Sequence, residues 1–400
     1  MYAISPATFS VALCQAPSGG DRTSLLIPPH APLSSYLHTP LSPHTSTCPS
    51  LLMSFSLPTC CSHLASNLLS GPLPSTLGGL KNLQSLDLGS NRLTGQLPST
   101  LQRCWLLKYL SVPANQLSGP VPGWLGSLKQ LQVLELYSNL LSGRIPPSLA
   151  GATALESIAL DDNRLSGPLP PALGNLPNLV ALYAARNSLE GPIPASFKRL
   201  KSLMYLDLSY NKGINGSVPA FLGNLWLLES LAMEHCNLTG QIPPSLGTLV
   251  FLVEIFLDGN RLSGRIPATL GSLESLNKLY LNRNRLTGSI PAQLCYLSYA
   301  YELNLGSLES LNKLFLNRNR LTGSIPAQLC HLHYIYDLNL ATSLTTTSRA
   351  HSLRSRLTAF SALPSPSRPS QRQQRRLPQP PHGQTPSHSK EIQSPLLVCG

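Results

Sequence analysis

The sequence predicts an α/β repeat solenoid: a right-handed superhelix with a parallel β-sheet on its concave face, and with disordered termini. Three observations predict this fold. A leucine-rich pattern recurs about every 24 residues, an asparagine stands at one place in nearly every copy, and a proline follows it at a nearly constant distance. Because one copy buries too few side chains to fold alone, the copies must stack on one another.

The stretch Leu125–Pro146, LGSLKQLQVLELYSNLLSGRIP, is a representative copy. Its apolar residues are spaced by three, three, three and two positions, which fits neither a sustained helix nor a sustained strand. We therefore expect a short strand at LQVLELY and a bend at Asn139. The side-chain amide of Asn139 can bond the backbone of the neighbouring coil, so successive copies should form an asparagine ladder.

The ladder positions are 24 residues apart, except for one interval of 25 and one of 35. A register this regular does not arise by chance. The predicted ladder residues are Asn67, Asn91, Asn115, Asn139, Asn163, Asn187, Asn211, Cys236, Asn260, Asn284 and Asn319. Cys236 holds a ladder position and Cys104 a leucine position, so we expect both thiols to be buried, reduced and structural.

The interval of 35 residues reflects an internal duplication. Gly271–Leu305 and Gly306–Leu340 are identical at 30 of 35 positions, and each unit is 11 residues longer than one copy of the repeat. We expect an irregularity at 296–308, with the later copies stacking again. The alternatives are a recent accidental duplication and an error in the gene model.

The repeats divide the chain into three parts. Residues 1–59 are rich in Ser, Pro, Thr and His and are predicted to be disordered. Residues 60–340 form the predicted repeat domain of about 11 copies. Residues 341–400 form a Pro-, Gln- and Arg-rich tail, also predicted to be disordered, with eight Lys or Arg residues against one Glu. Most of the net charge of +12 therefore lies in the tail, and the repeats do not indicate a nucleic-acid-binding surface.

Targeting signals are weak in this sequence. Met1–Ala16 lacks a basic start, and Pro6 and Ser10 interrupt its apolar run, so it does not resemble a typical signal peptide. No apolar run reaches the roughly 18 residues that a membrane-spanning helix needs, so we expect no transmembrane segment.

The candidate binding surface is the concave face. Residues six, four, two and one positions before each ladder residue should project from it, and they combine aromatic with charged side chains. Aromatic and charged side chains on one rigid face are typical of a binding surface. The predicted ligand-binding residues are Tyr109, Glu135, Tyr137, Asp161, Tyr183, Arg186, Tyr205, Asp207, Tyr210, Glu234, His235, Phe256, Asp258, Tyr280 and Arg283.

The same columns also contain Glu254 and Lys278. Acidic side chains dominate from Glu135 to Asp258, and basic ones from Lys278 onward. The alternative interpretation is that all these residues are ordinary solvated strand positions. The sequence contains no P-loop, G-x-S-x-G, H-E-x-x-H, paired C-x-x-C or kinase motif. We therefore expect no enzymatic activity, no cofactor and no metal site.

Two sequons, Asn215-Gly216-Ser217 and Asn237-Leu238-Thr239, fit the consensus for N-glycosylation. Because Cys236 takes the ladder position, Asn237 should project outward. Both asparagines are predicted glycosylation sites, although two sequons are only weak support for secretion.

The pattern L-x-x-L-x-L-x-x-N-x-L is that of the leucine-rich repeat, and the L-x-G-x-I-P that follows resembles its plant-type subclass. From Leu64 to about Leu340, the chain resembles the ectodomains of plant leucine-rich repeat receptor-like kinases and receptor-like proteins. It also resembles the secreted polygalacturonase-inhibitor family. The resemblance implies an extracellular recognition protein.

The first hypothesis is a non-catalytic recognition module that binds a protein or peptide ligand through its concave face, as a receptor ectodomain does. A co-receptor and a cell-wall enzyme are candidates for this protein ligand, and we expect no nucleic acid as a partner. The alternatives are a secreted inhibitor of a cell-wall polysaccharide-degrading enzyme, an intracellular interaction scaffold, and a fragment or partly incorrect gene product.

Overall fold

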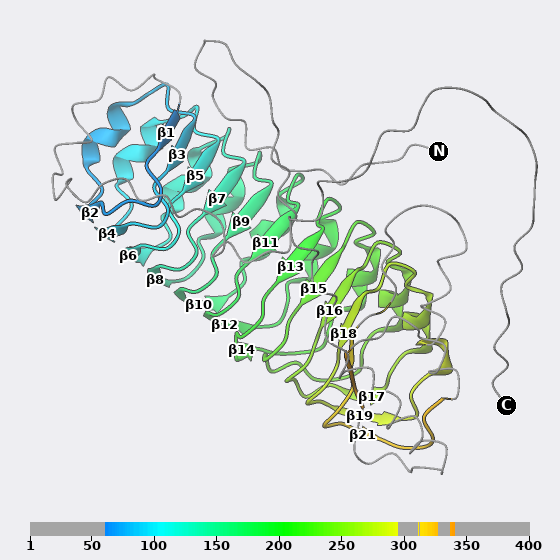
Figure 1. Cartoon of the computed structure of the whole chain (residues 1–400). Coiled ribbons are helices and arrows are strands. Elements are labelled where there is room, and N and C mark those ends of the chain that lie inside the picture. Colours follow the sequence, from blue (N-terminus) through cyan, green and yellow to red (C-terminus); the bar gives the residue numbers. More distant parts are fainter. Residues whose placement is uncertain (1–60, 295–310, 312, 327–336, 341–400) are drawn as a thin grey trace, which may run out of the picture.

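The computed structural model describes residues 61–294, 311, 313–326 and 337–340. Within these residues, short coils stack side by side into one elongated, curved body (Figure 1). The predicted solenoid with parallel strands is confirmed. The segments expected to be disordered, 1–59 and 341–400, and the irregularity expected at 296–308 lie outside the described residues.

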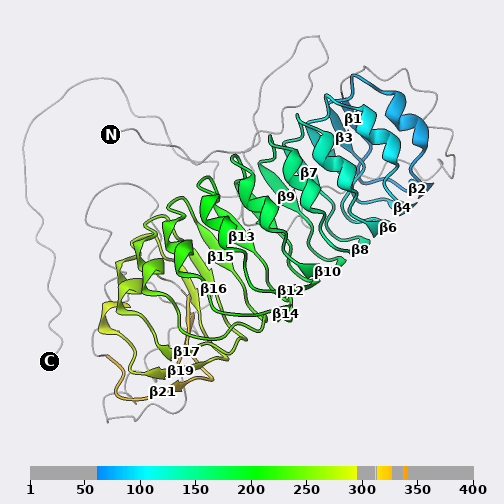
Figure 2. The same cartoon turned by 180° about the vertical axis from the view of Figure 1, so that it is seen from behind.

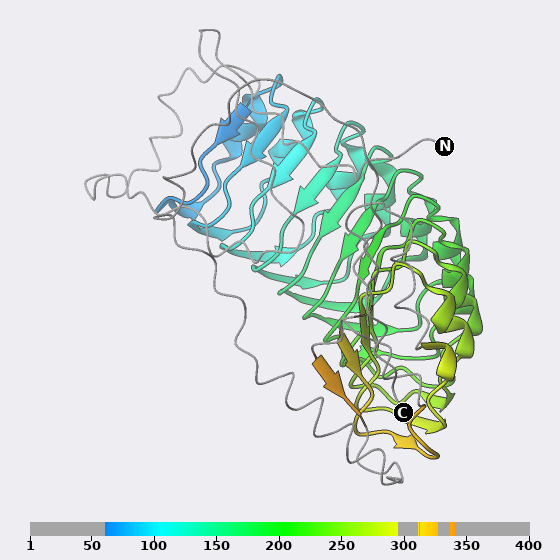
Figure 3. The ribbon, with the colours of Figure 1, turned by 45° about the vertical axis from the view of Figure 1, so that its right-hand side comes forward.

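The main sheet contains one three-residue strand from each coil, and its strands pair in parallel (Figure 3). Partner residues in neighbouring strands are 24 positions apart through most of the sheet, for example Ser157 and Ala181. In order, the strands are β1 (Cys61–His63), β3 (Ser85–Asp87), β5 (Tyr109–Ser111), β7 (Val133–Glu135), β9 (Ser157–Ala159), β11 (Ala181–Tyr183), β13 (Tyr205–Asp207), β15 (Ser230–Ala232), β16 (Glu254–Phe256), β18 (Lys278–Tyr280), β20 (Lys313–Phe315) and β22 (Asp337–Asn339).

Two further sheets lie on the flank that follows each ladder residue, where the L-x-G motif runs. Gly143 of this motif has a φ of +75°, a conformation that glycine adopts without strain. The sequence did not predict these sheets as separate elements. They are a seven-stranded sheet of β2 (Ser70–Pro72), β4 (Arg92–Gly95), β6 (Gln116–Pro120), β8 (Leu140–Gly143), β10 (Arg164–Pro168), β12 (Ser188–Gly191) and β14 (Gly213–Ile214), and a three-stranded sheet of β17 (Ser263–Arg265), β19 (Arg285–Gly288) and β21 (Arg320–Leu321).

The remaining side of each coil is a five-residue 3-10 helix, and no α-helix occurs among the described residues. A proline in extended conformation precedes each helix, as Pro122 does with a ψ of 132°. Figure 2 shows these helical turns side by side along the body. They are η3 (Ser75–Gly79), η4 (Ser99–Arg103), η5 (Gly123–Ser127), η6 (Pro147–Gly151), η7 (Pro171–Asn175), η8 (Ala195–Arg199), η9 (Ala220–Asn224), η10 (Pro244–Thr248) and η11 (Ala268–Ser272).

The core is one continuous column of leucine side chains that runs through the body. From β3 to β20 of the main sheet, the middle residue of each strand points into it, as Leu134 and Leu182 do with no exposed surface. Phe197 fills a leucine position and is fully buried. Cys104 is also buried and unbridged, as the sequence predicted.

The asparagine ladder has the predicted form. The Asn139 side chain donates to the carbonyl of Val112 in the preceding coil at 3.0 Å, and to Leu136 and Tyr137 in its own. Its Oδ1 accepts the N–H of Leu117 at 3.0 Å. One buried amide thus satisfies backbone groups of two coils, which explains why the position recurs.

Cys236 holds its ladder position with fewer bonds. Its Sγ lies 3.3 Å from the carbonyl oxygen of Leu208 in the preceding coil. Cys236 has no amide oxygen to accept the N–H of Ile214, the group that corresponds to Leu117 in the coil described above. The N–H of Ile214 donates to the carbonyl of Asn211 instead. Burial raises the pKa of the Cys236 thiol to about 12, so the thiol is a structural group rather than a reactive one.

The duplicated segment stacks on the solenoid at its described residues. Strand β20 pairs directly with β18, with Lys278 opposite Lys313. The amide of Asn319 donates to the carbonyl of Leu281 at 2.9 Å, so the ladder continues across the interval of 35 residues. The expected re-stacking of the later copies is therefore correct for β20 and β22.

Several adjacent helical turns approach one another so closely that only a glycine fits between them. A Cβ atom on Gly126 would lie 1.8 Å from the carbonyl oxygen of Ser148 in the next coil. Equivalent glycines, such as Gly174 and Gly247, would meet the next coil in the same way.

No helix among the described residues is long and apolar enough to cross a membrane.

We predict that Asn139→Ala lowers the free energy of unfolding by about 2 kcal/mol or more, because it leaves buried backbone groups of two coils without partners. Urea denaturation followed by circular dichroism measures this change. The control is Asn178→Ala, since Asn178 is exposed and makes only one long hydrogen bond. Equal stabilities of the two variants would contradict the role of the ladder.

We also predict that Gly126→Ala destabilises the protein by roughly 1–3 kcal/mol, because the new methyl group must push two coils apart. Gly79→Ala is the matched control, since a Cβ there would meet nothing within 4 Å. Thermal unfolding of both variants tests this. A Gly126→Ala protein as stable as Gly79→Ala would show that the coils can separate freely.

Candidate functional site

The concave face presents columns of side chains that run across consecutive coils. In β13, Leu206 is buried, while Tyr205 and Asp207 are half-buried on the opposite side of the strand. After each strand the chain bends through a residue of positive φ, and the ladder residue follows. The concave columns therefore repeat from coil to coil at a fixed place.

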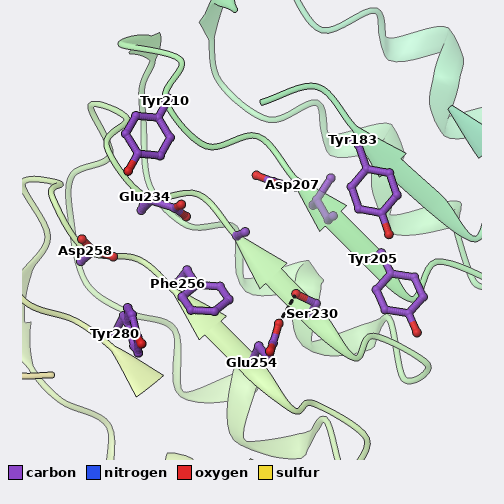
Figure 4. Close-up of a pocket in the computed structure, with 12 residues that line it drawn as sticks. Tyr183, Tyr205, Asp207, Tyr210, Ser230, Glu234, Glu254, Phe256, Asp258 and Tyr280 are labelled. Carbon is purple, nitrogen blue, oxygen red and sulfur yellow. Dashed lines mark hydrogen bonds between the residues drawn. The ribbon is translucent and has the colours of Figure 1, made fainter. Parts of the chain in front are cut away.

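A pocket of about 380 Å³ opens where β11, β13, β15, β16 and β18 lie side by side (Figure 4). Five of its lining residues are aromatic, four are acidic, and none is a lysine, an arginine or a histidine. The lining residues are Tyr183, Tyr205, Leu206, Asp207, Tyr210, Ser230, Ala232, Glu234, Glu254, Phe256, Asp258 and Tyr280.

Two aromatic pairs stand on opposite sides of this pocket (Figure 4). The tyrosine pair, Tyr183 and Tyr205, is stacked with ring centroids 6.4 Å apart. The Phe256–Tyr280 pair meets edge to face at 4.9 Å. The hydroxyl of Tyr205 donates to Glu229 at 2.5 Å, which fixes its ring. Both walls are thus built from rings in successive coils.

A third stack forms the rim, at the bend after the strands. The guanidinium of Arg186 lies 4.7 Å from the ring centre of Tyr210, and Tyr210 stacks on His235 at 4.8 Å. All three residues have a φ between 52° and 58°, a conformation that bulky residues rarely adopt. The next coil carries Gly259 there, and a Cβ atom on it would lie 2.7 Å from His235 Nδ1. The stack therefore ends at His235.

Ser209 ties together two of the pocket carboxylates. Its N–H donates to Asp207 Oδ1 at 2.9 Å, and its hydroxyl donates to Glu234 Oε2 at 2.5 Å. Ser209 is almost fully buried, so it holds these carboxylates from below. Among the described residues, neither Asp207 nor Glu234 forms an ion pair.

The other two pocket carboxylates have basic neighbours outside the pocket. Glu254 pairs with Lys278 of the next strand at 2.5 Å and accepts a long bond from Ser230. Asp258 Oδ2 lies 3.8 Å from His235 Nε2 and accepts a bond from Asn282 at 3.4 Å. Glu254 and Asp258 thus have basic partners at two edges of the pocket. Asp207 and Glu234 at its centre form no ion pair, and the charge of Arg186 at the rim lowers the pKa of Asp207.

Burial raises the pKa of every acidic group along this face for which a shift is resolved. Burial is the largest cause for Asp207, Glu234 and Asp258, and repulsion from Asp207 and Asp258 adds to the rise at Glu234. Asp161 reaches a pKa of about 7, because burial outweighs the hydrogen bond from the Ala185 N–H. Ionising these carboxyl groups at neutral pH therefore costs more free energy than ionising a carboxyl group in water.

The pocket brings together eight of the predicted ligand-binding residues. They are Tyr183, Tyr205, Asp207, Tyr210, Glu234, Phe256, Asp258 and Tyr280. Arg186 and His235 lie at the rim, in the stack with Tyr210. Ser230 and Glu254 also line the pocket without having been selected, although both lie in the column six residues before a ladder position. Selecting every residue of that column would have included both of them.

The remaining predicted residues lie on the concave face outside the pocket. Tyr109 is exposed on β5, and Glu135 on β7 accepts a hydrogen bond from Ser111 at 2.8 Å. Burial, followed by nearby carboxylates, raises the pKa of Tyr137. Arg283 lies beyond the pocket toward the C-terminal end, and its charge lowers the pKa of Asp258. Their roles in ligand binding stay predictions.

The two sequons lie on the flank of the L-x-G motif rather than on the concave face. Asn215 follows β14 and is exposed, whereas Asn237 is half-buried. Their glycosylation stays a prediction. No group of three or more His, Cys, Asp or Glu side chains in the described part of the chain is arranged to hold a metal ion.

Comparisons with known proteins agree with this geometry. Family models described as leucine rich repeat match residues 106–165 and, separately, 82–104, 227–249, 251–273, 275–297 and 310–332. A search of curated proteins gave no match. Among solved structures, the chain is similar to a TDR receptor, with 31% identity over 71% of this chain and 51% of that chain, and a TM-score of 0.64.

It is also similar to the ectodomain of the Arabidopsis receptor kinase HAESA in complex with an IDA peptide hormone, with 32% identity over 70% of this chain and 50% of that chain, and a TM-score of 0.62. The chain is a plant-type leucine-rich repeat protein. This leucine-rich repeat protein spans about half the length of both receptors. A plant ice-binding protein matches it as well, with 29% identity over 57% of this chain and 74% of that chain, and a TM-score of 0.52.

We predict that this leucine-rich repeat protein loses roughly 2 kcal/mol of stability between pH 5 and pH 8 through Asp161. The folded pKa of about 7 lies above the unfolded value of 3.8, so the stabilising proton is lost as pH rises through this window. Asp161→Asn keeps the acceptor for Ala185 but carries no charge. Thermal unfolding at both pH values should show a smaller pH effect for the variant, and an unchanged effect would contradict the assignment.

Proposed function

We propose that this protein is a non-catalytic recognition module that binds a peptide, or an extended segment of a protein, through the pocket on its concave face. The observation that carries the proposal is the set of aromatic rings around that pocket, from Tyr183 in β11 to Tyr280 in β18. These rings are only partly buried, and a cluster of apolar surface that a protein leaves open to solvent typically marks a site of interaction.

The dimensions of the site support an extended ligand. The pocket crosses five neighbouring strands, which are spaced about 4.8 Å apart in a sheet. A peptide lying across them would contact several coils at once and would gain from the rigidity of the solenoid. The rings of the two aromatic pairs offer large contact area at low entropic cost, which is typical of binding hot spots.

The comparisons support a receptor-like role without deciding the ligand. HAESA is described in complex with a peptide hormone and the TDR protein as a receptor, so we propose an extracellular, receptor-ectodomain-like role for this chain. The match to an ice-binding protein shows that the fold alone does not determine function. The pocket, rather than the fold, is therefore the basis of the proposal.

The test is a selection of random peptides displayed on phage against the full chain, followed by affinity measurements on the peptides selected. We predict that Tyr183→Ala combined with Phe256→Ala weakens binding at least tenfold, because it removes a ring from each wall. Circular dichroism should show an unchanged fold, since neither side chain belongs to the buried core.

Trp226→Ala is the matched control, because Trp226 is a large aromatic side chain that is 58% exposed and does not line the pocket. It should leave the affinity unchanged. Peptides that bind the double variant as tightly as the wild type, or that depend on Trp226 instead, would place the binding surface elsewhere and refute the proposal.

A further inference from the structure

We propose that the pocket selects ligands by a positively charged side chain, an arginine or a lysine, which inserts between the two aromatic pairs and faces Asp207 and Glu234. This inference rests on the proposed function and adds to it the chemical class of the residue that is read. It follows from the charge, the hydrogen bonds and the rings around the pocket.

The pocket is acidic, although the chain as a whole is basic. The net charge of the chain is +12, most of it in residues 341–400, whereas four of the 12 residues that line the pocket are acidic and none is basic. A cluster of one sign within a concave surface focuses the electrostatic potential and attracts groups of opposite charge. Charge complementarity thus favours a cationic occupant over an acidic or a purely apolar one.

Among the described residues, the chain's own cations form no ion pair with the two central carboxylates, although the charge of Arg186 at the rim lowers the pKa of Asp207. Lys278 pairs with Glu254 at one edge, and His235 lies 3.8 Å from Asp258 at another. Asp207 and Glu234 accept hydrogen bonds from Ser209, which is a neutral donor. A carboxylate can accept several hydrogen bonds, so Asp207 and Glu234 can still accept hydrogen bonds from a ligand.

Repulsion among the carboxylates supports the same conclusion. Burial is the largest cause of the raised pKa of Glu234, and repulsion from Asp207 and Asp258 adds to the rise, against the lowering effect of the Ser209 hydrogen bond. A cation placed among these groups would relieve that repulsion, and it would be bound more strongly than at an exposed surface because the site is partly desolvated. The carboxylates come from three successive coils, so a planar guanidinium with donors on several sides suits them well.

The aromatic walls provide the second half of the recognition. Cations bind favourably over the faces of tyrosine and phenylalanine rings. The protein already contains one such contact at the rim, where the Arg186 guanidinium lies 4.7 Å from the ring centre of Tyr210. The tyrosine pair and the Phe256–Tyr280 pair can hold a ligand's cation in the same way, with its aliphatic stem against the rings (Figure 4).

The test uses the random peptides displayed on phage against the full chain. We expect arginine or lysine to be enriched at one position of the selected peptides relative to the unselected library. In a synthetic copy of the best peptide, citrulline then replaces that arginine, or the lysine is acetylated, which removes the charge but little of the shape. This change should weaken binding at least tenfold.

Asp207→Asn and Glu234→Gln remove the charges on the protein side. Each should weaken the cationic peptide about tenfold while leaving the affinity of the neutral analogue unchanged, because the lost interaction needs both partners. A merely structural effect of the substitutions would weaken both peptides alike. Glu190→Gln is the matched control, since Glu190 is exposed on β12 of the second sheet. It should change neither affinity.

The outcomes separate this inference from the proposed function. Selected peptides that depend on Tyr183 and Phe256 but show no enrichment of arginine or lysine would overturn the inference and leave the proposed function intact. Equal binding of the charged peptide and its neutral analogue would do the same. If no peptide depends on Tyr183 and Phe256, the proposed function fails and the inference fails with it.

Discussion

The asparagine at the bend of each coil makes the rest of the structure possible. Asn139 bonds backbone groups of its own coil and of the preceding one, and it is almost fully buried while doing so. Because those groups would otherwise be buried without partners, a coil bends where its ladder residue meets the coil before it, and Cys236 takes this place in one coil through its Sγ. The leucine column then fills the space inside the bends, and the glycines of the helical turns let the coils approach one another.

This constraint also creates the candidate site. Coils held in one register place equivalent side chains side by side, so that a tyrosine in one coil stands beside the residue that occupies its position in the next. Phe256 meets Tyr280, its direct partner in the register, whereas Tyr183 stacks diagonally on Tyr205, since its direct partner is Asp207. The scaffold fixes where a concave side chain lies but leaves its identity free. The side chains that contact a ligand can therefore change without destabilising the fold. The acidic and aromatic residues at the centre of the concave face are one such choice of side chains.

Much of the fold could be predicted because its determinants are local and periodic. Asparagine, leucine and proline each recur at their own place in the coil, and the structure puts Asn139, Leu134 and Pro122 where the period requires. The two smaller sheets on the flank were not predicted, because their short strands have no alternating pattern of their own. The columns of the concave face were predictable for the same reason as the ladder.

The pocket within those columns was less predictable. Ser209 lies in the column two residues before a ladder position but is not in the predicted set, because its column does not show that it is buried and bridges Asp207 and Glu234. The pairing of Lys278 with Glu254 depends on side-chain conformations in two coils, and so does the stack of Arg186, Tyr210 and His235. Register indicates which residues can meet, whereas only the three-dimensional arrangement shows which of them leave a pocket between them.

The most direct test of this account is a crystal structure of the full chain bound to a selected peptide. The account predicts that the peptide lies across β11, β13, β15, β16 and β18, with an arginine or lysine side chain between Tyr205 and Phe256 and within hydrogen-bond distance of Asp207 or Glu234. A peptide bound to the helical turns, or to the flank that carries β2 to β14, would contradict it.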